Sequence, residues 1–179
     1  MRRPPAFDKA FSPLVYESAS RDLVLQFKHG DRLGHATLLA QLMAPHVASF
    51  GYESPIVLPV PLHPMRIMRR RFNQSALIAK ALGKRLDLPV DVLALKRTRA
   101  TPMQQGLNAS QRRRNVRGAF AVDRARAKRI QGHDIMLIDD VYTTGATAEA
   151  CARALRKAGA GRIGVLTATR VVGPEAAIL

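Results

Sequence analysis

Residues 134–147 read Asp-Ile-Met-Leu-Ile-Asp-Asp-Val-Tyr-Thr-Thr-Gly-Ala-Thr, and this stretch decides the fold. The apolar run Ile135–Ile138 is typical of a strand buried on both faces. It leads directly into two adjacent carboxylates, Asp139 and Asp140. A turn rich in threonine and glycine follows, and then Ala146–Leu155, whose composition favours a helix. The sequence therefore predicts a strand, an acidic pair, a hydroxyl-rich loop and a helix N-terminus in immediate succession.

This order of elements is suited to holding a sugar phosphate. The first turn of a helix offers free N–H groups and the positive end of its dipole to an anion. Glycine lets the backbone approach the phosphate closely, and carboxylates accept hydrogen bonds from sugar hydroxyls. Asp139 and Asp140 can share a ligand only where the strand has ended, since side chains alternate along a strand, and the pattern ends it there. We expect the phosphate to bind a loop formed by Thr143, Thr144, Gly145, Ala146 and Thr147.

A simpler alternative treats Thr143 or Thr144 as a helix cap and the acidic pair as a solvated strand end. Two like charges at the end of a buried strand repel each other and lose solvation, which is costly if they are dehydrated. The acidic pair therefore favours a ligand site. The Walker pattern Gly-x-x-x-x-Gly-Lys-Ser/Thr is absent from the sequence, and we do not expect the strand–turn–helix of a dinucleotide-binding domain.

Length and composition indicate one globular domain. The chain has 179 residues, of which 47% are hydrophobic and 23% charged, and this suits a single substantial core. No apolar run reaches 18 residues, and no apolar segment follows the basic residues 1–7. We therefore expect a cytoplasmic protein without signal peptide or membrane insertion. The single cysteine, Cys151, cannot form an intrachain disulfide or build a zinc site, so we expect no zinc.

The charge balance is strongly basic, with 29 Lys and Arg against 13 Asp and Glu, a formal net charge of +16. Such a field attracts polyanions. A small, highly charged substrate and a nucleic acid both fit it, and an arginine-rich composition can also reflect genomic base content.

Hydrophobic periodicity and chain breakers divide the sequence into alternating elements. Helices are expected at residues 21–28, 33–50 and 73–86, and strands at 56–58, 90–95, 120–122 and 163–168 besides the central one. Pro45 argues for a kink in the second helix or an earlier end, and Asn73 or Ser75 can cap the third. Residues 1–12 are expected to lie extended over the surface, and residues 96–117 to form a long loop with room for one short helix.

This alternation predicts an α/β fold with a mostly parallel central sheet of about five strands and helices on both faces. We expect a single domain, residues 1–179, in which an N-terminal helical segment (1–50) precedes the core sheet (51–179).

Three unusual segments follow predicted strands, at residues 59–64, 96–117 and 139–147. Ligands of parallel α/β sheets bind at the carboxyl ends of strands, so we expect the three segments to form one site. The first is rich in proline and leads to Arg66 and Arg69–Arg71; it is either a rigid connector or an anion clamp. The second carries seven Lys and Arg residues and no acid. It fits a solvated loop, a lid that excludes water, or a track for a nucleic-acid backbone.

Residues 135–147 resemble the phosphoribosyl pyrophosphate (PRPP) motif of type I phosphoribosyltransferases, in which a hydrophobic strand, an acidic pair and Thr-Thr-Gly-x-Thr occur in register. From about residue 11 to residue 170 the chain is similar, more narrowly, to the competence protein F (ComF) type. Further matches to signatures of that family lie at residues 27–30, 59–64, 71–74, 101–107, 112–115 and 118–120. Two departures are visible. Arg71 stands where the family usually has glycine, and the four-cysteine zinc ribbon with which many members begin has no counterpart here.

The resemblance implies the type I phosphoribosyltransferase fold and transfer of a phosphoribosyl group from PRPP to a nitrogen nucleophile. Asp139 and Asp140 would be catalytic, orienting the ribose, with Mg²⁺ held near them through PRPP and water rather than by the protein directly. The 5′-phosphate would bind residues 143–147. Pyrophosphate would bind Val60, Pro61, Leu62, His63 and Arg66. The flexible loop would contribute Arg97, Thr98, Gln104, Arg112 and Asn115.

A second class of function stays open. The ComF resemblance implies a link to DNA uptake, and a charge of +16 suits single-stranded DNA, so a non-catalytic PRPP-sensing or DNA-binding module is the alternative. The partners that these readings allow are PRPP, a nucleobase or another nitrogen acceptor, single-stranded DNA, DNA-uptake proteins and a second copy of the chain.

Overall fold

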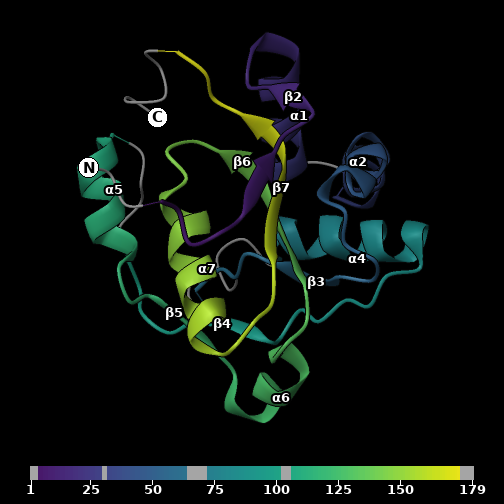
Figure 1. Ribbon diagram of the computed structural model, residues 1–179. Helices are drawn as coiled ribbons and strands as arrows, with labels where there is room; N and C mark the ends of the chain where they lie inside the picture. The colour runs from purple at the N-terminus through teal and green to yellow at the C-terminus, as the bar shows by residue number, and fades with distance from the viewer. Residues whose placement is uncertain (1–3, 30–31, 64–71, 102–105, 174–179) are drawn as a thin grey trace.

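The computed structural model describes residues 4–29, 32–63, 72–101 and 106–173, and its centre is a parallel sheet of five strands (Figure 1). The order is β1-β7-β6-β3, and β2 pairs with the far part of β7. These strands are β1 (Lys9–Phe11), β2 (Leu14–Val15), β3 (Ile56–Pro59), β6 (Ile135–Tyr142) and β7 (Ile163–Arg170). All registered pairs in this sheet are parallel, which confirms the expected α/β class.

Helices cover both faces of the sheet (Figure 1). One face carries a helical layer, and the other carries the motif helix with an antiparallel ribbon beside it. The first layer contains α1 (Ser18–His29), α2 (Arg32–Met43), the 3-10 turns η1 (Ala44–His46) and η2 (Ala48–Phe50), and α4 (Gln74–Leu86). The second contains α5 (Ala109–Val116), α7 (Ala146–Lys157) and the ribbon of β4 (Leu95–Arg97) and β5 (Phe120–Val122), with η3 (Arg124–Arg126) and α6 (Ala127–Ile130) following it.

The motif strand is buried on both sides, as its apolar run predicts. Ile135 and Leu137 belong to the core under α7, whereas Met136 and Ile138 belong to the core under α2 and α4. All four are fully buried. This alternation is the period of two that a strand imposes on its side chains.

Two sequence predictions about strand ends were wrong. The strand predicted at 90–95 is reduced to a bridge from Val90 to β3 and to Leu95, the first residue of β4, because Asp91 accepts a hydrogen bond from the Leu93 N–H in a local turn. The motif strand does not end before the acidic pair. It loses its neighbour β3 after Ile138 but stays paired with β7 as far as Tyr142.

Of three further elements, two agree with alternatives that the sequence allowed, an earlier end of the second helix and a short helix within residues 96–117. The second helix ends at Met43, and Pro45 lies in the first turn of η1, where the missing N–H of proline costs nothing. The predicted loop at 96–117 begins inside β4 and contains the eight-residue helix α5. Within the extended N-terminal segment, residues 9–11 form an edge strand of the sheet.

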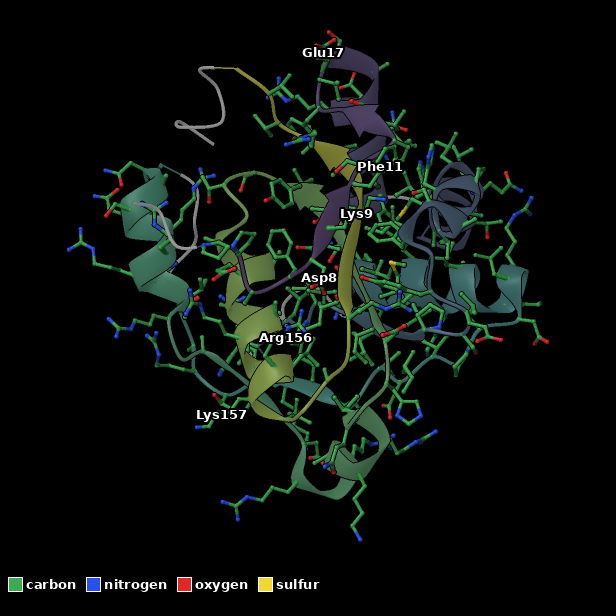
Figure 2. The ribbon with its side chains drawn as sticks, in the orientation of Figure 1. Asp8, Lys9, Phe11, Glu17, Arg156 and Lys157 are labelled. Carbon is green, nitrogen blue, oxygen red and sulfur yellow. The ribbon has the colours of Figure 1, made fainter. Side chains whose placement is uncertain are left out.

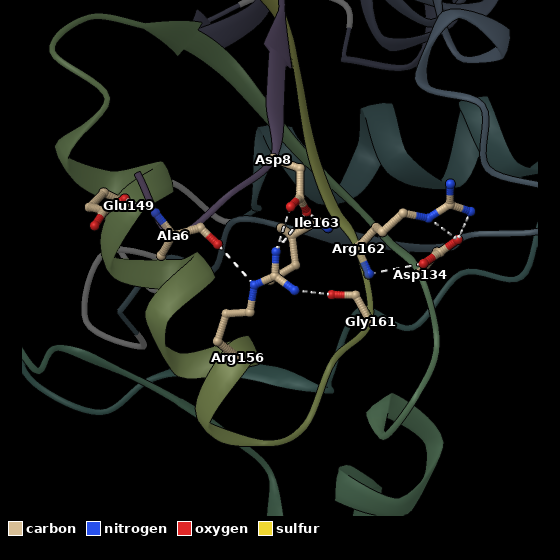
Figure 3. Close-up of polar contacts among 8 residues, drawn as sticks. All are labelled: Ala6, Asp8, Asp134, Glu149, Arg156, Gly161, Arg162 and Ile163. Carbon is tan, nitrogen blue, oxygen red and sulfur yellow. Dashed lines mark hydrogen bonds and ion pairs between the residues drawn. The ribbon is translucent and has the colours of Figure 1, made fainter. Parts of the chain in front are cut away.

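A cluster of polar contacts holds the N-terminal strand in place (Figures 2 and 3). Both carboxylate oxygens of Asp8 accept hydrogen bonds from Arg156 Nη2 on α7, at 2.8 and 2.7 Å. Asp8 Oδ2 also accepts from the Ile163 N–H at 2.6 Å, and the Ala6 N–H donates to Glu149 Oε2 at 2.7 Å. The segment before β1 is therefore tied to both α7 and β7.

The spacing Gly-x-Gly-x-x-Gly does occur, at residues 159–164. It leads from the end of α7 into β7. A dinucleotide fingerprint requires the opposite order, a strand followed by a helix, so this glycine cluster is a helix-to-strand connection.

Candidate functional site

The sheet order brings two of the three predicted segments together. Strands β3 and β6 are neighbours and run parallel, so residues 60–63, which follow β3, lie at the same edge of the sheet as the end of β6 and the loop after it. The Val60 N–H donates a hydrogen bond to the Ile138 carbonyl at 2.8 Å, directly before the acidic pair. This edge is the one at which parallel sheets bind ligands.

The acidic pair lies where β6 has lost β3 as its neighbour. Asp139 Oδ1 accepts hydrogen bonds from Ser75 Oγ at 2.9 Å and from the Asp140 N–H at 3.0 Å. Asp140 Oδ1 accepts from the Val141 N–H at 2.8 Å. Because the strand continues through both residues, their side chains leave it on alternate sides, and a ligand that touches both has to lie over the strand edge.

Desolvation affects the carboxyl of Asp139. Desolvation, together with the nearby charge of Asp140, raises the pKa of Asp139 to about 8, although the hydrogen bond from Ser75 works in the opposite direction. Asp139 is therefore poised to change charge near neutral pH. A cation that arrives at this edge favours its ionised form.

The loop after β6 has the features of an anion cradle. Gly145 adopts φ +72° at the N-cap of α7, in the left-handed region that favours glycine. Thr144 Oγ1 is buried, and no hydrogen-bond partner for it exists in the described part of the structure. A small cavity here is lined by residues 139, 141–143, 145–148 and 167. Of the five residues predicted to hold a phosphate, Thr143, Gly145, Ala146 and Thr147 line this cavity and Thr144 does not.

The predicted pyrophosphate segment is partly described. Val60 and Pro61 are buried, and Leu62 and His63 are partly exposed. The Val60 carbonyl accepts a hydrogen bond from Asn73 Nδ2 at 3.0 Å. Arg66 lies outside the described residues. The segment next to the acidic pair is therefore fixed from both sides at Val60.

The structure places the residues predicted for a flexible loop differently. Arg97 is buried, donates to Thr101 Oγ1 and stacks with its guanidinium carbon 5.3 Å from the Phe120 ring centre. Arg112 is 1% exposed, and burial lowers its pKa. Neither side chain lines the cavity at the phosphate loop.

The remaining residues of that segment are held by backbone contacts. The Thr98 N–H donates to the Ala119 carbonyl at 2.9 Å, and the Asn115 carbonyl accepts from Arg99 Nη2 at 3.0 Å. Gln104 lies outside the described residues. Helix α5 packs against α7, so the described part of the segment forms a wall beside the phosphate loop.

That wall bounds a second hollow of about 390 Å³. It lies between the N-terminal segment, α5 and the start of α7. Its lining includes the rings of Phe7 and Tyr142 and the cations of Arg113 and Arg153, with Arg153 paired to Glu149 at 2.6 Å. Gly145 and Ala146 line both this hollow and the cavity at the phosphate loop.

Sequence reasoning missed the role of the residues that begin α4. Asn73 and Ser75 were interpreted as helix caps, yet their side chains contact Val60 and Asp139. The available signal was position, because α4 is the next element along the chain after β3 and the proline-rich segment.

Two further findings concern membrane spans and metal sites. Across the described ranges, no helix is long and apolar enough to cross a membrane. The same residues contain no group of three or more His, Cys, Asp or Glu side chains placed to hold a metal ion on their own.

Comparisons with known proteins agree with this geometry. Residues 73–173 match the model of the phosphoribosyl transferase domain family. The chain is 33% identical over 170 residues to the DNA utilization protein YhgH of Salmonella typhi, covering 92% of this chain and 73% of that protein. It is 31% identical over 170 residues to competence protein F of Haemophilus influenzae, covering 92% and 74%.

Among solved structures, the chain is similar to glutamine PRPP amidotransferase from Bacillus subtilis, with a TM-score of 0.48, 21% identity, and coverage of 74% of this chain and 25% of that one. The family match spans more than half of the present sequence, and the relatives match along most of their own length. The chain therefore belongs to the phosphoribosyltransferase family, in its ComF type.

Proposed function

We propose that this protein binds PRPP with Mg²⁺ and transfers its phosphoribosyl group to a nitrogen nucleophile. One observation carries the proposal. The Thr144 hydroxyl is buried and has no hydrogen-bond partner among the described residues. It lies with the left-handed Gly145 at the start of α7, at the same sheet edge as a carboxylate pair. The helix N-terminus and the hydroxyls suit the 5′-phosphate, and the carboxylates suit the ribose hydroxyls.

The carboxylates also fit a hard cation that is shared with the ligand. Mg²⁺ keeps several waters and is usually held by one or two carboxylates together with substrate phosphates, and two adjacent carboxylates are present. When bound, the ion would neutralise charge on the departing pyrophosphate. Asp139 and Asp140 would orient the ribose and stabilise positive charge that develops at the anomeric carbon.

The other groups would bind the pyrophosphate and shield the ribose from water. The fixed backbone of residues 60–63 would contact the pyrophosphate, as would Arg66, and the α5 wall would limit the access of water to the ribose. Arg97 and Arg112 would need to leave their buried positions to reach the ligand directly. The names of the relatives, DNA utilization protein and competence protein F, support a role in DNA uptake.

Calorimetric titration of PRPP with Mg²⁺ tests the proposal. Wild type should bind, and the Asp139→Asn/Asp140→Asn double variant should bind at least tenfold more weakly, since charged hydrogen bonds are each worth about 1.5–3 kcal/mol. Release of pyrophosphate with a panel of purine and pyrimidine bases then tests turnover. Absence of binding by wild type would sink the proposal.

A second candidate is a single-stranded DNA-binding module. The 390 Å³ hollow supports it, because two rings and two arginines lie beside the phosphate loop and aromatic stacking with cationic contacts is how single strands are held. The net charge of +16 points the same way. Salt-dependent DNA binding that persists in the double Asp variant, without pyrophosphate release from PRPP, would favour this module.

A further inference from the structure

The residue at the N-cap of α4 does not cap its helix. Asn73 has the extended backbone of an N-cap (φ −105°, ψ 114°), and asparagine is among the best capping residues. Its side chain makes no capping hydrogen bond to the helix. Nδ2 instead donates to the Val60 carbonyl at 3.0 Å, in the segment expected to hold pyrophosphate. The Asn73 side chain therefore contacts this segment instead of capping the helix.

Ser75, the other residue suited to capping, also turns away from the helix. It is 4% exposed, and its Oγ donates to Asp139 Oδ1 at 2.9 Å across 64 positions of sequence. Asp139 is partly exposed, and its carboxyl is desolvated by the residues around it. The serine hydroxyl therefore replaces part of the solvent for this carboxylate and fixes the direction of Oδ1.

These contacts connect the proline-rich segment to the acidic pair by two routes. The Val60 N–H is bonded to Ile138, the residue before Asp139, at 2.8 Å. The Val60 carbonyl is bonded to Asn73, and Ser75, two residues on, is bonded to Asp139. The spacing between the proline-rich segment and the acidic pair is thus set twice, once by the sheet and once by the first turn of α4.

Gln74 lies between Asn73 and Ser75 in the sequence, and its side-chain amide is a hydrogen-bond donor. It is 3% exposed, and its Nε2 has no hydrogen-bond partner within the described residues. A buried donor without an acceptor destabilises the folded protein. An oxygen-rich ligand at this edge would supply the acceptor.

We propose that the first turn of α4 is a third binding element of the site. Asn73 and Ser75 are positioning residues that set the spacing between the pyrophosphate segment and the ribose carboxylates, and the Gln74 amide donates to an oxygen of the bound diphosphate ester. This inference rests on the proposed function, since it assumes that PRPP is the ligand.

Three substitutions separate this role from a merely structural one. Gln74→Met keeps the length of the side chain and removes the orphaned donor, so thermal stability should hold or rise while PRPP affinity falls about tenfold. Asn73→Ser keeps a residue that can cap the helix but is too short to hold Val60, so stability should again hold while affinity falls several-fold. Ser75→Ala should weaken PRPP binding, and Ser75→Thr, which keeps the hydroxyl, should restore it.

The measurement is calorimetric titration of PRPP with Mg²⁺ into the full chain, alongside thermal unfolding of each variant. Ser49→Ala is the matched control: its hydroxyl bonds the His46 carbonyl on the surface, and its loss should leave affinity unchanged. If wild type binds PRPP while Gln74→Met and Asn73→Ser bind within twofold of it, this inference is overturned and the proposed function stands. If wild type does not bind PRPP, both this inference and the proposed function are wrong.

Discussion

The hydroxyl of Tyr142 occupies the space that a side chain at Gly145 would need: a Cβ built at Gly145 would lie 2.4 Å from Tyr142 Oη. Gly145 is therefore required twice, for its left-handed backbone and for this close approach. Tyr142 closes one side of the phosphate loop, and the glycine lets the loop fold against it.

Gly145→Ala should remove detectable PRPP binding and lower the free energy of unfolding by about 1–3 kcal/mol, the usual cost of a strained backbone conformation. Titration and urea unfolding measure the two effects. Gly51→Ala is the control, because Gly51 has a similar φ of +69° but open space around its Cβ position. It should show the cost of strain without the loss of binding. Equal losses of binding in both variants would contradict the argument.

Asp139 makes the stability of the unliganded protein depend on pH. Its pKa is raised by burial, so the folded state prefers the protonated form. This contribution to stability is complete below pH 4, the range of an unperturbed carboxyl, and is lost as the pH rises through about 8. Asp139→Asn should therefore become progressively more stable than wild type between pH 5 and pH 9, whereas Asp22→Asn, on the exposed side of α1, should not. Urea unfolding across this range measures the difference, and a constant difference would contradict the assignment.

Arg112 is a buried cation, and its Nε and Nη2 have no hydrogen-bond partners in the ranges that the structure describes. Replacing a buried charge by an apolar side chain of similar size is often neutral or stabilising. Arg112→Met should leave the free energy of unfolding unchanged or raise it by about 1 kcal/mol, while Arg112→Ala should lower it by about 2 kcal/mol through the cavity it leaves. Arg113→Met, on the exposed side of the same helix, should have little effect. A large loss in Arg112→Met would reveal a structural partner for this guanidinium.

The anchor between Asp8 and Arg156 is half-exposed, so its ion pair should contribute little by itself. The hydrogen bond from the Ile163 N–H to Asp8 is less exposed and should matter more. Asp8→Ala should therefore cost about 1–2 kcal/mol of unfolding free energy, and Arg156→Ala clearly less. A double-mutant cycle between the two residues, read by urea unfolding, should give a coupling energy below about 1 kcal/mol. A coupling energy as large as the whole effect of Asp8→Ala would contradict this division.

Periodicity predicted the fold class because the apolar pattern is local, and the place of the candidate site stays a prediction. The run Ile135–Ile138 is apolar at every position, and such a strand is stable only with a layer on each face. The predictions that failed concern features that depend on tertiary neighbours. β6 continues past Ile138 because β7 is still beside it, and this pairing cannot be identified from the sequence of β6.

The directions of several side chains could not be predicted from the sequence either. Asn73 and Ser75 satisfy the pattern of a helix cap, but packing turned both towards the site. Arg97 and Arg112 belong to a basic segment for which a solvated loop was one interpretation, yet both side chains are buried. Local propensity favours one set of contacts, and the assembled layers select another.

The pairing of β1 with β7 has a consequence for the synthesis of the protein. Asp8 and Ile163 are 155 positions apart, so the ribosome completes the N-terminal strand long before its partner exists. Contacts of such separation are slow to form. A nascent chain that stops before residue 163 lacks the strand that pairs with β1, β2 and β6, which leaves the edges of these strands unpaired and exposed to other chains.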